Sequence, residues 1–341
     1  MKAAIVNPYL DTMGGGERYS LSFALALVSK GYDVHFQWKD KSIKEKLEKR
    51  FGMDLSKVTF VDNVKRGDGY DVCFWVSDGS IPTLRARSNF LHFQVPFTDV
   101  NGFSLLNKMK LYRVKKIICN SFFTKKFIDE EYRVNSIVIY PPVDVAKIKS
   151  KRKQNMILFV GRFSQLKQAK NQDVLIKAFK KFYNAGYSDW KLILAGGVEV
   201  GVGDYLEKLE KMIGDYPVEI VKSPDFKKIK ELYGYAKIYW SAVGFGEDEN
   251  KEPEKVEHFG ISLVEAMAGG AVPVVYSAGG YKEIISEGKT GFLFKRESEL
   301  VKITKGLAKQ KGKLREISKK AKEASKVYEY DRFVGEITSL I

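Results

Sequence analysis

Between Glu257 and Tyr276 the chain reads Glu-His-Phe-Gly-Ile-Ser-Leu-Val-Glu-Ala-Met-Ala-Gly-Gly-Ala-Val-Pro-Val-Val-Tyr. This stretch predicts a loop, a short helix that starts near Gly260 and a buried strand, the repeating unit of parallel α/β sheets. A helix that starts at a glycine offers backbone N–H groups to an anion, and the glycine lets a ligand approach closely. Glu257 and Glu265 lie on either side of that glycine, so both carboxylates can face one pocket. Carboxylates beside a phosphate site need neutral partners, and sugar hydroxyls are the natural candidate.

Strand-like segments alternate with helical patterns through most of the chain, which is typical of parallel α/β sheets. Several are continuous apolar runs, as expected for strands that are covered on both faces. The predicted strands of the first half are 2–7, 33–38, 57–62, 70–76, 89–94, 116–120 and 136–140. Those of the second half are 156–160, 190–195, 217–222, 237–241, 271–276 and 291–294. We therefore expect an α/β protein of two doubly wound domains with parallel, Rossmann-like sheets.

A polar and basic segment separates the two halves. It follows the paired prolines of the stretch 140–144, which end a strand. We predict a first domain over 1–146, a linker over 147–155 and a second domain over 156–327. Two such domains place a cleft between the carboxyl ends of their strands.

The length and composition indicate a soluble globular protein. A chain of 341 residues is long enough for two ordinary domains, and 44% of its residues are hydrophobic and 29% charged. No stretch approaches the ~20 apolar residues that cross a bilayer, and Lys2–Val6 is typical of a strand rather than a signal segment. We therefore expect a cytoplasmic protein. Cys73 and Cys119 lie in apolar runs, which predicts buried free thiols.

The formal net charge of +16 has several possible explanations. An anionic ligand, a nucleic acid and an anionic membrane face are three of them, and solvated helix faces are the ordinary alternative. No nucleic-acid-binding signature is apparent, so we do not expect a nucleic acid as partner. Residues 103–116 mix basic and apolar positions, which fits either a membrane surface or an amphipathic helix packed on the core.

The stretch around Gly260 resembles the donor-binding signature of family 4 glycosyltransferases, the retaining class with the two-domain GT-B fold. The resemblance covers nearly the whole chain. It implies that Glu257 lies near the transferred sugar and Glu265 near the nucleotide ribose. It also implies that residues 328–341 form a final helix that crosses back to the first domain. The other residues that this stretch would give to the donor site are His258, Phe259 and Ile261.

Basic residues follow the first predicted strand of the second half. Arg162 comes directly after that strand, and Lys167 and Lys170 follow. A guanidinium and an ammonium suit a diphosphate, and they stabilise the charge that grows on the leaving group. The resembled family has a lysine about one turn after the arginine, whereas this chain offers two candidates. We favour Lys170, because Lys-Asn just before a predicted helix matches the family better.

Three consecutive glycines, Gly14, Gly15 and Gly16, follow the first predicted strand. Such a cluster turns backbone N–H groups toward an anion, unless it is only a turn. Its spacing is not the Gly-x-Gly-x-x-Gly of a dehydrogenase. The segment resembles the first glycine loop of the family, especially of mannosyltransferases that extend lipid-linked oligosaccharides, which implies contacts with the donor diphosphate and the acceptor. Gly196 and Gly197 also follow a strand, and we expect them near the base or ribose if they are not simply a turn.

His92 ends a predicted strand of the first domain. It could be an ordinary core histidine. The resembled family places a histidine at the end of a comparable strand, near the hydroxyls and the reacting carbon of the sugar. On that basis the candidate catalytic residues are His92, Glu257, Arg162 and Lys170.

The preferred interpretation is a retaining glycosyltransferase that uses a nucleotide-diphosphate sugar, such as GDP-mannose or a UDP-sugar. The hexose, with mannose indicated by the glycine loop alone, would pass to a hydroxyl of a glycan or a polyprenyl-linked acceptor. We expect no metal ion or other cofactor, because Asp248 is not part of an Asp-x-Asp pair. The positive charge fits a peripheral position on the cytosolic membrane face. Two alternatives are a sugar-nucleotide epimerase or hydrolase on the same fold, and a basic nucleic-acid-binding protein.

Overall fold

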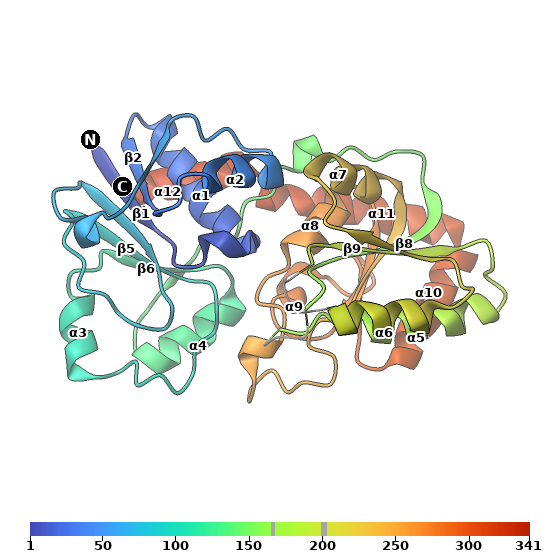
Figure 1. The fold of residues 1–341 in the computed structure, drawn as a ribbon. Coiled ribbons are helices and arrows are strands. Elements are labelled where there is room, and N and C mark those ends of the chain that lie inside the picture. The colour runs from blue at the N-terminus through green and yellow to red at the C-terminus, as the bar shows by residue number, and fades with distance from the viewer. Residues whose placement is uncertain (165–167, 199–202) are drawn as a thin grey trace. The chain divides into compact units, whose positions relative to one another are not determined.

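The protein folds into two compact α/β units, shown in the computed structural model of Figure 1. The first unit consists of Met1–Pro142 and Tyr330–Ile341, and the second of Val143–Glu329. Each contains one sheet in which all strand pairs are parallel, with 7 strands in the first unit and 6 in the second. The predicted pair of doubly wound α/β domains is confirmed. The structure describes residues 1–164, 168–198 and 203–341.

The sheet of the first unit has the strand order β3-β2-β1-β4-β5-β6-β7. Its strands are β1 (Lys2–Val6), β2 (Asp33–Gln37), β3 (Val58–Val61), β4 (Val72–Val76), β5 (Ser88–Phe93), β6 (Lys116–Cys119) and β7 (Ile137–Val138). Its helices are α1 (Gly15–Ser29), α2 (Ile43–Phe51), α3 (Leu105–Leu111), α4 (Phe122–Tyr132) and α12 (Tyr330–Leu340). The order reverses between β1 and β4, whose register pairs Val6 with Trp75. Ligands of doubly wound sheets bind outside such a switch point.

The second sheet repeats this pattern in the order β10-β9-β8-β11-β12-β13. Its strands are β8 (Gln154–Val160), β9 (Lys191–Gly196), β10 (Val218–Lys222), β11 (Ala236–Ser241), β12 (Val272–Tyr276) and β13 (Phe292–Phe294). Its helices are α5 (Gln172–Asn184), α6 (Gly203–Ile213), α7 (Phe226–Tyr235), α8 (Ile261–Ala268), α9 (Tyr281–Ile284), α10 (Glu297–Lys309) and α11 (Lys311–Ser325). The switch point of this sheet lies between β8 and β11.

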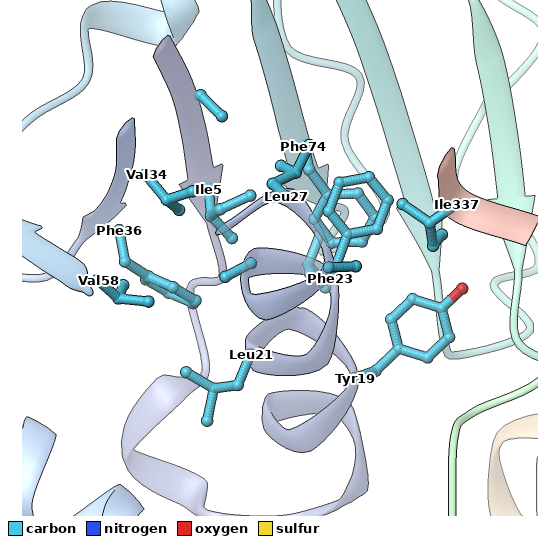
Figure 2. Close-up of a cluster of buried hydrophobic side chains, with 14 of the residues drawn as sticks. Ile5, Tyr19, Leu21, Phe23, Leu27, Val34, Phe36, Val58, Phe74 and Ile337 are labelled. Carbon is cyan, nitrogen blue, oxygen red and sulfur yellow. The ribbon is translucent and has the colours of Figure 1, made fainter. Parts of the chain in front are cut away.

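The core of the first unit forms where α1 covers its sheet (Figure 2). Tyr19, Phe23 and Leu27 recur every four residues, so they share one face of the helix, and all three are buried. The ring of Phe23 stacks on that of Phe74, with centroids 3.9 Å apart. Ile337 of α12 is buried in the same cluster. Residues from both ends of the sequence therefore build one core, and the red helix α12 lies among the elements of the first unit in Figure 1.

The segment 147–155, which we expected to be a linker, packs on the second unit. The ammonium of Lys153 donates hydrogen bonds to the carbonyl oxygens of Tyr233, Ala236 and Gly269. Strand β8 already begins at Gln154. The first part of the first unit ends at Pro142, which is the second of the paired prolines. A basic segment can lie against the protein in this way, because a lysine side chain reaches the free carbonyls at helix ends.

The remaining observations concern the two cysteines and the apolar character of the helices. Cys73 and Cys119 are free and buried, as predicted. Among the residues that the structure describes, none of the helices combines the length and the apolar character required to span a bilayer.

Candidate functional site

The candidate residues of the second unit gather at the carboxyl edge of its sheet. Arg162 follows β8 and Gly197 follows β9, and the turn after β12, at Gly279 and Gly280, lies beside Glu257. Because the strands are parallel, segments that are far apart in the sequence meet at this edge. The edge contains the switch point between β8 and β11, where doubly wound sheets bind their ligands.

The ends of β8 and β9 approach each other through glycines. A Cβ atom on Gly196 would lie 1.9 Å from the carbonyl oxygen of Gly161, so this position has no room for a side chain. The N–H of Phe163 donates to the carbonyl of Gly197 over 2.9 Å. These contacts hold the backbone on both sides of Arg162. Gly196 and Gly197 therefore shape the loop that carries the arginine.

A nearly buried ion pair joins Lys170 to Glu257. The ammonium lies 3.3 Å from the carboxylate, and the two side chains are only 11% and 18% exposed. Lys170 also donates to the side-chain oxygen of Gln168 over 2.6 Å. Low exposure makes such a pair electrostatically stronger than a surface pair, and the loss of one partner costlier. Lys167, the other candidate cation, lies outside the described residues.

Gly260 begins α8 in a conformation that suits only glycine. Its φ is 115°, and a Cβ atom there would lie 2.7 Å from the ring of Tyr281. The turn after β12 packs against the same loop, since the N–H of Gly280 donates to the carbonyl of Glu257 over 2.7 Å. A Cβ atom on Gly279 would lie 2.1 Å from that carbonyl oxygen. Three glycines thus allow the backbone contacts that hold the stretch between Glu257 and the helix.

Both carboxylates of the stretch act on one buried phenol. Glu265 of α8 is only 6% exposed. Tyr239 of β11 shares a hydrogen bond of 2.8 Å with the hydroxyl of Ser262. Burial raises the pKa of the Tyr239 phenol, and the nearby carboxylates of Glu257 and Glu265 raise it further. The two acids, eight positions apart in the sequence, therefore both influence the same hydroxyl.

The side chains that follow Glu257 have different surroundings. The Nε2 atom of His258 lies 3.3 Å from the carbonyl oxygen of Glu254, so its ring turns toward the preceding loop. Phe259 is buried and packs edge-on against Tyr328, with centroids 5.3 Å apart. Ile261 is half-buried at the first position of α8. The ring of Phe259 therefore faces Tyr328, and only its backbone contributes to the loop before α8.

The acidic loop 244–255 contributes a contact that sequence reasoning missed. The carboxylate of Glu249 accepts a hydrogen bond from the N–H of Gly279 over 2.7 Å and pairs with the ammonium of Lys282. A backbone N–H of the glycine pair after β12 therefore already holds an anion. The sequence showed the charge of the loop but gave no sign of which acid turns inward.

In the first unit, the glycine cluster forms the start of α1. The N–H of Gly14 donates to the carboxylate of Glu17 over 2.6 Å, and the helix begins at Gly15. A Cβ atom on Gly16 would lie 1.7 Å from the side-chain oxygen of Gln94. Gln94, directly after β5, thus lies against the glycine loop. Sequence reasoning missed it, although a polar residue just after a parallel strand was a usable signal.

The structure places His92 in the core instead of at an accessible strand end. The residue is fully buried, and its ring stacks on that of Tyr19 with centroids 4.0 Å apart. Its Nδ1 atom lies 3.0 Å from the carbonyl oxygen of Ile118 and donates to it. Burial lowers the pKa of His92 to about 3, so the ring is neutral at physiological pH. A ring without exposed surface does not contact a sugar in this conformation.

Comparison with known proteins identifies the family. Residues 142–324 match the family described as glycosyl transferases group 1, and this match covers more than half of the chain. The chain belongs to that family. The resemblance inferred from the Glu257–Gly270 stretch is therefore confirmed.

Curated relatives of this family member include mannosyltransferases. A GDP-Man:Man(3)GlcNAc(2)-PP-Dol alpha-1,2-mannosyltransferase of Dictyostelium discoideum is 25% identical over 300 residues, which are 78% of this chain and 57% of that protein. An enzyme of the same description from Xenopus laevis is 30% identical over 196 residues, 52% of this chain and 38% of that protein. The glycosyltransferase chain thus spans little more than half of the length of the first relative and less of the second.

Solved structures share the fold. HepE of Anabaena, crystallised in complex with UDP, has a TM-score of 0.78 at 19% identity, with 99% of both chains covered. Sucrose-phosphate synthase of Thermosynechococcus elongatus has a TM-score of 0.74 at 14% identity, over 100% of this chain and 98% of that chain. These similarities confirm the GT-B class of fold for this group 1 glycosyltransferase.

Proposed function

We propose that the protein is a retaining glycosyltransferase whose second unit binds a nucleotide-diphosphate sugar. The observation that carries the proposal is the Lys170–Glu257 pair at the carboxyl edge of the second sheet, where Arg162 follows β8 and the Gly260 turn leads into the helix of Glu265. Family membership and the mannosyltransferase relatives support it. The hexose, mannose by analogy with those relatives, would pass to a hydroxyl of a glycan or of a lipid-linked oligosaccharide.

The charges at this edge suit the donor. Arg162 and Lys170 would hold the diphosphate and stabilise the negative charge that grows on it as the bond between sugar and phosphate breaks. Lys170 would then exchange Glu257 for a phosphate oxygen. The freed Glu257 carboxylate would accept hydrogen bonds from sugar hydroxyls, and Glu265 would accept them from the ribose.

The configuration of the anomeric carbon is retained when the acceptor attacks the face of the sugar from which the diphosphate departs. The oxygen of the acceptor hydroxyl forms the new bond to the anomeric carbon, and the bond from that carbon to the diphosphate oxygen breaks. The proton of the hydroxyl passes to the departing phosphate. The proposed reaction uses no metal ion or other cofactor, so transfer should persist in the presence of a chelator.

We further propose that the enzyme works in the cytoplasm at the face of an anionic membrane. The relatives are named for a PP-Dol acceptor, and a polyprenyl-linked acceptor would reside in such a membrane. The net charge of +16 favours a peripheral position there.

Thermal shift measurements with GDP-, UDP- and ADP-sugars test the donor site. We expect one class of donor to raise the melting temperature. Arg162→Ala, Lys170→Ala and Glu265→Ala should each weaken donor binding about tenfold or more, because each removes a charged partner. Lys227→Ala, which removes an exposed ammonium from α7, is the matched control and should bind the donor normally.

Labelled donor then separates transfer from the alternatives. A transferase needs an acceptor, whereas an epimerase or hydrolase converts the donor without one. Full activity of Arg162→Ala or Glu265→Ala, or donor conversion that ignores the acceptor, would contradict the proposal.

A further inference from the structure

Helix α3 of the first unit exposes a row of apolar side chains. Leu105 is 75% exposed, Leu106 60%, Met109 68% and Tyr112 93%. None of the residues of α3 is buried. Soluble proteins rarely gather large apolar side chains on one exposed element without a binding function. The sequence left open whether this helix packs on the core, and the structure shows that its apolar row faces outward.

The exposed side chains form a stripe with basic residues beside it. At about 100° per residue, Leu105, Met109 and Tyr112 lie within roughly 60° of one another around the helix axis. Lys108 projects on one side of this stripe and Lys110 on the other. An apolar stripe between lysines is the pattern of a helix that lies in a membrane interface.

The helix is held in place from its inner side. The carboxylate of Glu131 accepts hydrogen bonds from three backbone N–H groups of the preceding loop, those of Asp99, Val100 and Gly102. The hydroxyl of Ser104 caps the helix by accepting from the N–H of Asn107 over 3.2 Å. Leu111 packs against the neighbouring apolar cluster. The outward row is therefore a defined surface and not a frayed end.

The helix and the residues next to it in the sequence carry positive charge only. Residues 101–116 contain five lysines and arginines and no aspartate or glutamate. The ring of Phe103 is in contact with two cations, the ammonium of Lys108, 3.9 Å from its centroid, and the guanidinium of Arg133, 3.7 Å from it. Such a surface attracts an anionic partner, and the apolar stripe requires that partner to have an apolar interior.

We propose that α3 and its flanking residues 103–116 form a docking surface for an anionic lipid bilayer. A nucleic acid would match the charge but would leave Leu105, Leu106 and Met109 in water. A bilayer matches both the positive charge and the apolar stripe, since the apolar side chains enter the acyl boundary while lysine and arginine reach the phosphates. Tyr112 has the amphipathic ring that is enriched at this depth. This surface rests on the proposed membrane position of the enzyme but not on the transfer reaction, because docking needs neither donor nor acceptor.

Co-sedimentation of the full chain with vesicles tests this surface. The vesicles consist of phosphatidylcholine alone or with about one third phosphatidylglycerol. We expect binding to the anionic vesicles that falls as salt rises. Leu105→Gln with Met109→Gln, and separately Lys108→Gln with Lys110→Gln, should each lower the partition coefficient by about tenfold or more.

A matched control comes from α2, where the apolar residues Ile43, Leu47 and Phe51 are buried beneath exposed lysines. Lys46→Gln with Lys49→Gln removes the same charge from that helix and should leave binding within about twofold of the original. A loss equal to that of the α3 lysines would mean that charge alone, anywhere on the chain, drives binding. That result would overturn the proposal.

Fluorescence of Tyr112→Trp reports where the bilayer touches. We expect a blue shift on addition of anionic vesicles, relative to the same titration of the unsubstituted protein. No vesicle binding, or binding without a change at position 112, would overturn the docking surface. The donor measurements above are made without lipid, so failure of one proposal is distinguishable from failure of the other.

Discussion

His92 and Gln94 lie two positions apart at the end of strand β5, and their surroundings differ. Both lie against α1, where His92 meets the ring of Tyr19 and Gln94 meets Gly16. The rings of Tyr19 and Phe74 both stack on the buried histidine, whereas Gly16 leaves room for the amide of Gln94. The surroundings of each side chain depend on the residue that α1 places opposite, and this pairing could not be predicted from the strand alone.

Burial of His92 predicts an acid sensitivity. The pKa is lowered to about 3 in the folded protein, while that of an unfolded histidine stays near its ordinary value of about 6.5. Between these values the unfolded chain binds a proton that the folded chain does not, so stability falls as the pH falls. The contribution is about 2 kcal/mol between pH 7 and pH 5.

Urea unfolding of the protein and of His92→Phe at several pH values checks this expectation. The variant keeps an aromatic ring beside Tyr19 and has no group to protonate. Its free energy of unfolding should therefore depend less on pH, whatever its absolute value. Parallel pH curves for the two proteins would show that His92 is not the titrating group.

At the scale of elements, the start of α8 depends on how two segments meet, the loop that ends at Gly260 and the turn 279–281. Gly260, the ring of Tyr281 and the turn at Gly279 and Gly280 occupy adjoining space. The left-handed backbone of Gly260 and the tight contact with Tyr281 both exclude a side chain. The helix therefore begins where the neighbouring segment leaves room.

Gly260→Ala tests this arrangement. A Cβ atom would require strained backbone and would displace the tyrosine ring, so we expect a loss of about 1–3 kcal/mol in the free energy of unfolding. Donor binding should weaken as well, since the loop carries Glu257. Gly306→Ala within α10 is the control, because nothing lies within 4 Å of the added atom there. It should be neutral or stabilise by up to about 1 kcal/mol. Equal stability of the two variants would rule out a special requirement at Gly260.

Much of the element order was predictable from the sequence. All thirteen predicted strands are present, and those buried on both faces were recognisable as continuous apolar runs. Charged loops and segments were harder to predict. Glu249 turns inward to Gly279, and Lys153 reaches three carbonyl groups, although both belong to stretches that are typical of solvated chain. Long charged side chains find partners that only the folded backbone creates.

At the scale of the whole molecule, the first unit is built from two separate parts of the sequence. Helix α12 packs on α1, and its residues Phe333 and Ile337 are buried in the core of that unit. The phenol of Tyr19 donates to the carbonyl of Ile139 over 3.1 Å in the same region. The second unit lies between these two parts in the sequence.

Ile337→Ala should therefore destabilise the first unit. A large-to-small change at a fully buried site costs about 2–5 kcal/mol. Amide hydrogen exchange should show lost protection in α1 and the first sheet, with the second sheet unaffected. Leu307→Ala, a comparable change in the core of the second unit, should give the opposite pattern. Lost protection in both units from either variant would mean that the two unfold as one.

The discontinuity of the first unit also sets an order of events during synthesis. A ribosome releases residues 330–341 only after it has made the entire second unit. Until then the nascent first unit exposes the apolar face that Phe333 and Ile337 later cover. The first unit cannot complete its core until the second unit has been synthesised, and an apolar face that stays exposed in the interval favours aggregation.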